Sequence, residues 1–214
     1  MLAGRRLVGA HSRAEAHGPF VPAVGPVRRP RAALADRRAV LTLTEAAAQA
    51  DALAQAGDER ALADLRRQWE DEVEGAARDP DYRVRALAYR AIGQFRYRQK
   101  LELLERGLED ESPACRGSAL VSIEMLSRDS PGVINTTRRT LHELVGGDPN
   151  GAVRRLAIVC LKNGPAARET IALLRGLAES DDEDKQLRET AEKIGALLTK
   201  KANVGANARR SGGR

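Results

Sequence analysis

The sequence predicts an all-α protein in which antiparallel helix pairs stack side by side into an α-solenoid. The first observation behind this prediction is a ten-residue segment that recurs four times. Its copies begin 31, 38 and 34 residues apart, a period typical of proteins that repeat a pair of helices. The second observation is that apolar residues recur at helical spacing through residues 41–198, where no strand pattern competes. The four copies begin at Asp79, Asp110, Asp148 and Asp182.

The formal net charge of +6 comes from the two ends of the chain. Residues 1–40 contain eight arginines against two acidic residues, and residues 199–214 contain five basic residues and no acidic one. Residues 41–198 contain 23 basic and 28 acidic residues, so the predicted repeat domain is acidic. Four prolines between positions 19 and 30 disfavour both helix and sheet there. We therefore predict a disordered extension over 1–40, a repeat domain over 41–198 and a disordered basic tail over 199–214.

The N-terminal segment bears on where the protein is found. No apolar run approaches the ~20 residues of a transmembrane helix, so we expect no membrane insertion. The apolar stretch at residues 7–10 is too short for a secretory signal. The arginine-rich, acid-poor composition of residues 1–40 is a property of organelle transit peptides, but we favour an extension without a targeting role. The expected location is the cytoplasm, with an organelle as the alternative.

The repeated segment has the features of a helix start. Two residues after each initial aspartate comes a residue type preferred at the N-cap, such as Ser112 or Asn150. An apolar stripe then begins, and an alanine follows four residues later on the same face in every copy. Small side chains at that position let neighbouring helices approach closely, so we expect the tightest packing there. These alanines are Ala88, Ala119, Ala157 and Ala191.

An arginine also occupies one equivalent position in all four copies. Because the same residue type recurs four times, we interpret it as part of the architecture rather than as a ligand contact. We expect each arginine to pair with the initial aspartate of its own or the adjacent repeat, which would form a ladder along the solenoid. The predicted ladder consists of Asp79, Arg85, Asp110, Arg116, Asp148, Arg154, Asp182 and Arg188.

The pattern Asp-x-x-x-x-Val-Arg-x-x-Ala resembles the start of the second helix of HEAT repeats, and the resemblance covers roughly residues 41–198. It implies about four antiparallel helix pairs plus an unpaired helix, with the second helices lining a concave face. The tetratricopeptide repeat has a similar period, but its Trp, Gly, Tyr and Pro landmarks are missing. The predicted helices span about 44–56, 58–77, 81–95, 99–109, 112–127, 131–146, 149–163, 166–179 and 183–199.

The sequence contains no recognisable catalytic constellation. Its three histidines are His11, His17 and His142, and none has the spacing of a zinc protease motif. Cys115 and Cys160 fall on apolar stripes, where we interpret them as buried small side chains rather than reactive thiols. We therefore predict no enzymatic activity, no metal site and no cofactor.

One segment is a candidate for partner binding. Five of the six aromatic residues lie within residues 69–97, among many arginines. Tyrosine and arginine are enriched at protein interfaces. The alternative, which is slightly favoured for Tyr89, is that the side chain packs between adjacent helices. The candidate partner-binding residues are Tyr82, Tyr89, Arg90, Arg96 and Tyr97.

These observations favour a non-enzymatic scaffold or adaptor that binds a protein or peptide on the concave face. The first alternative is a nucleic-acid-binding protein that relies on the basic tails, although an acidic repeat domain would repel phosphate. The second alternative is an accessory or lyase-type protein, because HEAT-like repeats also occur in phycobilin lyases and deoxyhypusine hydroxylases. The His-Glu metal pairs of the hydroxylases are missing here.

The predicted alanine seam can be tested by Ala157→Asp. We expect this change to lower the free energy of unfolding by several kcal/mol, because it buries a carboxylate without a partner. Chemical denaturation followed by circular dichroism measures the effect. Cooperative unfolding at an unchanged midpoint would contradict the assigned register.

Overall fold

The computed structural model describes the backbone of residues 32–211 and the side chains of residues 43–206. Within this part of the chain the structure is helical and contains no strand. A 3₁₀ turn, η1 (Arg98–Lys100), leads into the short fourth α-helix. The α-helices are α1 (Ala32–Ala56), α2 (Glu59–Ala76), α3 (Tyr82–Gln94), α4 (Leu101–Leu108), α5 (Pro113–Asp129), α6 (Gly132–Gly147), α7 (Gly151–Leu161), α8 (Arg168–Glu179) and α9 (Lys185–Ser211).

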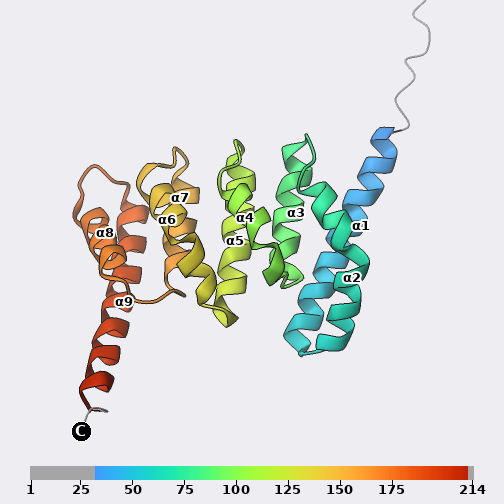
Figure 1. Cartoon of the computed structure of the whole chain (residues 1–214). Helices are drawn as coiled ribbons and strands as arrows, with labels where there is room; N and C mark the ends of the chain where they lie inside the picture. The colour runs from blue at the N-terminus through green and yellow to red at the C-terminus, as the bar shows by residue number, and fades with distance from the viewer. Residues whose placement is uncertain (1–31, 212–214) are drawn as a thin grey trace, which may run out of the picture.

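The helices pack as antiparallel pairs in one extended stack, from α1 at one end to α9 at the other (Figure 1). The pairs are α2 with α3, α4 with α5, α6 with α7, and α8 with α9. Helix α1 precedes them and packs against both α2 and α3. The prediction of an α-solenoid with four pairs and an unpaired helix is confirmed.

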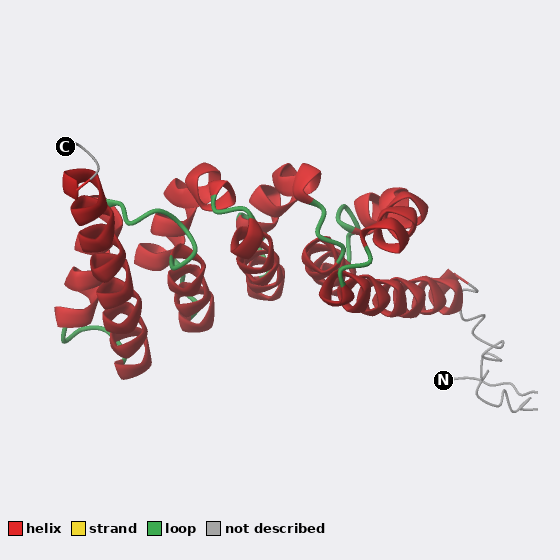
Figure 2. Ribbon diagram, turned by 90° about the horizontal axis from the view of Figure 1, so that it is seen from below, coloured by secondary structure: helices red, strands yellow, loops and turns green. Residues whose placement is uncertain are grey.

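Figure 2 shows the helices arranged in two rows along the molecule. Helices α3, α5, α7 and α9, which we call the inner row, pack directly against one another in sequence. In the outer row, formed by α2, α4, α6 and α8, the backbones of successive helices lie farther apart, and α6 and α8 meet through side chains such as His142 and Thr170. Because the inner row is closely packed and the outer row is splayed, the stack curves toward the inner row.

Short-range hydrogen bonds fix the start of the inner helices. The carboxylates of Asp110 and Asp148 each accept a hydrogen bond from the backbone N–H two residues later, at 2.9 and 2.8 Å. The side chain of Asn150 then caps α7 by accepting from the N–H groups of Ala152 and Val153. These bonds satisfy donors that a helix start leaves without an intrahelical partner. The turn before each inner helix is therefore determined by local sequence.

The core lies along the seam between successive inner helices. The alanines of the repeated segment lie here, and none has any exposed surface. Larger apolar side chains fill the space between the two rows, among them Ile92, Ile123 and Leu161. The small residues allow the close approach, and the larger ones supply most of the buried apolar area. The seam residues are Ala88, Ala119, Ala157 and Ala191.

The helices extend beyond both ends of the predicted repeat domain. Helix α1 begins at Ala32, and α9 continues to Ser211, so the backbone of residues 32–40 and 199–211 is helical. The helices thus continue past residues 41 and 198, and the division of the chain into domains stays a prediction. At the C-terminal end, the Lys201 ammonium donates to the Gly164 carbonyl at 2.7 Å and ties α9 to the turn after α7. The rest of the predicted tails, residues 1–31 and 212–214, lies outside the described residues.

The closest approach along the seam is tested by Gly93→Ala. A Cβ at Gly93 would lie 2.5 Å from the Ser122 hydroxyl oxygen and 2.7 Å from the Ser122 Cα, so the backbones of α3 and α5 would have to separate. We expect a loss of about 1–3 kcal/mol, measured as a lower Tm. The matched control is Gly75→Ala in α2, where a Cβ meets nothing within 4 Å, and this change should raise the Tm. Equal Tm changes would contradict the close contact.

Candidate interaction surfaces

The arginines of the first two repeats join each repeat to the next. The Arg85 guanidinium donates to both carboxylate oxygens of Asp110, at 2.8 and 2.9 Å. Arg116 does the same with Asp148, at 2.6 and 2.9 Å. Each arginine also donates to two carbonyls of the turn that precedes its own helix. One guanidinium thus holds two successive turns together.

The ladder has a different composition at its C-terminal end. Arg154 pairs with Glu183, at 2.7 and 2.6 Å, instead of with Asp182, which is exposed. The prediction of Asp182 as a member is therefore wrong by one position, because the four-acid turn before α9 places its third acid opposite the arginine. Arg188 reaches back 3.2 Å to Asp181 in the turn before its own helix.

The first ion pair of the ladder perturbs the ionisation of its acidic partner, Asp110. The hydrogen bond from Arg85 holds the pKa of Asp110 below its usual value, although burial opposes this shift. A depressed carboxyl pKa contributes stability above the ordinary pKa, and this contribution is lost as the pH falls through the lowered value. The ion pair between Arg85 and Asp110 therefore contributes less stability in acid.

The aromatic cluster divides into one exposed and several buried side chains. Tyr89 is 3% exposed and donates its hydroxyl to the Ala77 carbonyl at 3.3 Å, while Tyr97 is fully buried and donates to the Arg66 carbonyl. The prediction that these two tyrosines bind a partner is wrong, because both fill the space between the rows of helices. Tyr82 is 42% exposed and lies beside Arg83, whose guanidinium is 5.4 Å from the ring centroid.

The two predicted arginines of this cluster, Arg90 and Arg96, also differ in their surroundings. Arg96 has a left-handed backbone with φ of 54°, and its side chain donates to the Gly93 carbonyl and, at 3.0 Å, to Asp51 of α1. It therefore links α1 to α3. Arg90 is exposed on α3 and makes no ion pair within the described part of the chain. Of the predicted partner-binding residues, Tyr82 and Arg90 remain accessible.

Arg90 lies at a position of the repeat whose side chains form a solvent-facing stripe along the inner row. We call this stripe the inner face. The equivalent residues in the next repeats are Val121, Val159 and Lys193. A cation therefore stands on α3 and on α9, with two valines between them on α5 and α7. An alignment of the four repeats gives this order.

A small groove opens on the inner face between α5 and α7, with a volume of about 220 Å³. Burial alone would raise the pKa of Glu124 at its edge, but hydrogen bonds from Arg128 and Lys162 hold that pKa below its usual value. The carboxylate lies 2.7 Å from Arg128 and 2.8 Å from Lys162, so two cations share one acid. The apolar lining consists of Leu120, Val121, Leu156, Val159 and Cys160.

Charge is divided unequally between the two rows. Helix α3 contains three arginines and no acid, and α9 contains seven basic and two acidic residues. Helix α2 of the outer row contains six acidic and three basic residues. The excess acid of the repeat domain thus lies mainly in the outer row and in the turns before the inner helices. The inner face is basic, although the domain as a whole is acidic.

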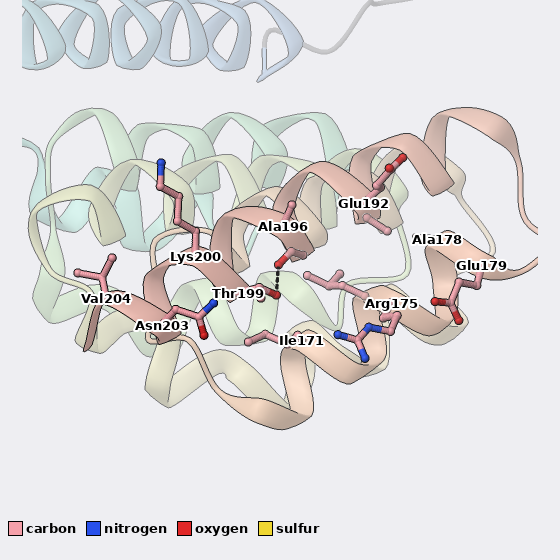
Figure 3. Close-up of a pocket in the computed structure, with 13 residues that line it drawn as sticks. Ile171, Arg175, Ala178, Glu179, Glu192, Ala196, Thr199, Lys200, Asn203 and Val204 are labelled. Carbon is pink, nitrogen blue, oxygen red and sulfur yellow. Dashed lines mark hydrogen bonds between the residues drawn. The ribbon is translucent and has the colours of Figure 1, made fainter. Parts of the chain in front are cut away.

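A second, larger groove lies at the C-terminal end of the stack, between α8 and α9, with a volume of about 750 Å³. Figure 3 shows side chains from both helices along its walls, including Ile171 and Arg175 from α8 and Thr199 from α9. Glu192 in this groove is equivalent to Tyr89, which is buried against the following repeat. A charged residue at this position is typical of a terminal repeat with a polar outer face.

The cysteines and the described histidine serve the packing. Burial raises the pKa of Cys115 to about 11, and its thiol donates to the Tyr82 carbonyl at 3.2 Å. Cys160 is buried and donates to the Leu120 carbonyl. The His142 Nε2 lies 2.9 Å from the Thr170 hydroxyl oxygen, and burial lowers its pKa. Over the described residues, no cluster of His, Cys, Asp and Glu is arranged to hold a metal ion.

An extended helical stack with an uncovered inner face defines a repeat protein of the α-solenoid class. Residues 73–138 match the family described as HEAT repeats. The resemblance to HEAT repeats seen in the sequence is therefore confirmed over these residues. HEAT repeats generally mediate interactions between proteins. A search of curated proteins finds no match to the chain. None of the described helices is both long and apolar enough to span a membrane.

The structural role of the ladder is tested by Arg116→Ala. The side chains of Arg116 and Asp148 are only 11% and 2% exposed, so the change leaves a buried carboxylate without its cation. We expect a loss of about 3 kcal/mol, measured as a lower Tm. Arg139→Ala is the control, because Arg139 is exposed and contacts Glu143 at 3.9 Å, and it should leave the Tm nearly unchanged. An unchanged Tm for Arg116→Ala would refute the structural assignment.

Proposed function

We propose that the protein is a non-enzymatic scaffold or adaptor that binds a protein or peptide on its inner face. The observation that carries this proposal is the uncovered apolar groove between α5 and α7, bordered by charged side chains. Val121 and Val159 are only partly buried there, although they lie at the centre of the stack. An apolar surface with a polar rim is the usual composition of a protein interface.

The arrangement of the repeats supports the same function. Stacked repeats present a continuous surface to which several helices contribute, and such surfaces bind extended partners. Among the described residues, the thiols of Cys115 and Cys160 are buried, and His142 lies on α6 of the outer row. The scaffold therefore needs only its shape, its apolar groove and its charges.

The nucleic-acid alternative relies on the basic tails, and the acidity of the repeat domain as a whole opposes it. The basic inner face removes that objection, so the two kinds of partner must be distinguished by experiment. Only Lys200 and Lys201 of the predicted C-terminal basic residues have described side chains. The lyase-type alternative is not favoured by any contact in the described part of the chain. Cytoplasmic location stays a prediction.

Site-specific photocrosslinking tests the proposed binding face. Ala114 and Ala152 are exposed, and each lies two helical turns before a valine of the groove, on the same face. We expect a photoreactive amino acid at either position to form adducts in a lysate of the source organism. Protease treatment should destroy the added mass, whereas nuclease treatment should leave it unchanged.

The matched controls are Glu102 of α4 and Thr136 of α6, which are exposed on the outer row. The same photoreactive amino acid at these positions should give no corresponding adducts. Equal crosslinking from both rows, or adducts that only nuclease removes, would contradict the proposal.

A further inference from the structure

The cations at the two sides of the inner face are free of acidic partners. Arg90 and Lys193 are exposed, and neither forms an ion pair or side-chain hydrogen bond among the described residues. Arg83 lies over the ring of Tyr82 and forms no ion pair within the described part of the chain. An arginine or lysine without a carboxylate in reach is available to an external anion.

The groove between these cations also carries an excess of positive charge. Arg128 and Lys162 share the single carboxylate of Glu124. The Arg128 side chain is 62% exposed, so its guanidinium remains accessible at the groove edge. A ligand that places an apolar group between Val121 and Val159 would bring its neighbouring groups close to this guanidinium.

The order of residues across the inner row sets the length of a matching ligand. Arg90 on α3 and Lys193 on α9 are separated by the two valines, so three helix-to-helix steps lie between them. Packed helices are about 8–10 Å apart, which makes the span roughly 25–30 Å. An extended chain advances about 3.3 Å per residue, so about eight or nine residues cross this distance.

The surroundings favour a peptide over a nucleic acid. Single-stranded nucleic acids are usually held by stacking on aromatic side chains. On the described inner row the exposed aromatic residue is Tyr82, which lies at the start of α3 and away from the groove.

We propose that the inner face binds an extended acidic segment of a partner protein, with an apolar residue near its centre and acidic residues on both sides. The central residue enters the groove between α5 and α7, and the flanking carboxylates pair with Arg90, Arg128 and Lys193. This inference rests on the proposed function and names the chemistry of the partner.

Fluorescence anisotropy with labelled synthetic probes tests this specificity. The first probe is a ten-residue peptide with three acidic residues at each end and four apolar residues, leucines and valines, in the middle. The second replaces the apolar residues with serine, the third replaces the acidic residues with lysine, and the fourth is a ten-nucleotide single-stranded DNA. We expect the first probe to bind at least tenfold more tightly than the other three. Its affinity should fall as salt rises, because exposed charges are screened.

Charge reversal identifies the residues responsible. The double change Arg90→Glu and Lys193→Glu should weaken binding of the acidic peptide at least tenfold and increase binding of the lysine peptide. The control is Arg106→Glu with Arg168→Glu, which changes the net charge equally at exposed positions of the outer row. This control should bind the acidic peptide like the wild type. Unchanged melting curves verify that both variants are folded.

Three results would overturn the inference: no binding of the acidic peptide, equal loss of binding in both double variants, or tighter binding of the DNA. These failures are distinct from failure of the proposed function. Protease-sensitive crosslinks at Ala114 and Ala152 without binding of the acidic peptide would leave the scaffold function in place and reject only the acidic ligand.

Discussion

The architecture depends on the guanidinium that holds the turn of one repeat against the turn of the next. Arg85 and Arg116 each contact two carbonyls of their own turn and a carboxylate of the following one. Helices with small side chains along a seam can slide or rotate relative to each other unless something fixes their ends. A planar, bidentate contact fixes both distance and orientation. The alanine seam therefore has one register.

This way of joining the repeats also determines where charge can accumulate. The acids needed by the ladder and by the helix starts lie in the turns, at one edge of the molecule. The stripe of the inner helices that faces away from the core is free of this requirement. Its residues, Arg90, Val121, Val159 and Lys193, therefore vary from repeat to repeat, whereas the alanines and arginines of the seam and ladder do not.

Features that repeat within a few residues could be predicted from the sequence, and features that depend on a neighbouring helix could not. The helix starts and the alanine seam follow from local spacing. The burial of Tyr89 depends on Gly107 in α4, where a Cβ would lie 3.1 Å from the tyrosine ring. The continuation of α9 depends on a long-range bond from Lys201 to Gly164. The inner face is formed by one position in each of the four repeats, so no single segment of the sequence indicates it.

The charged residue at the end of the stack has a consequence for changing the length of the array. Because Glu192 occupies the position that is Tyr89, Leu120 or Ile158 elsewhere, the last helix pair cannot serve unchanged as the template for an added one. A copy of the α6–α7 unit inserted inside the stack would meet matching apolar surfaces on both sides. A helix pair can thus be added inside the array without changing its neighbours. A pair added after α9 would first require replacement of Glu192.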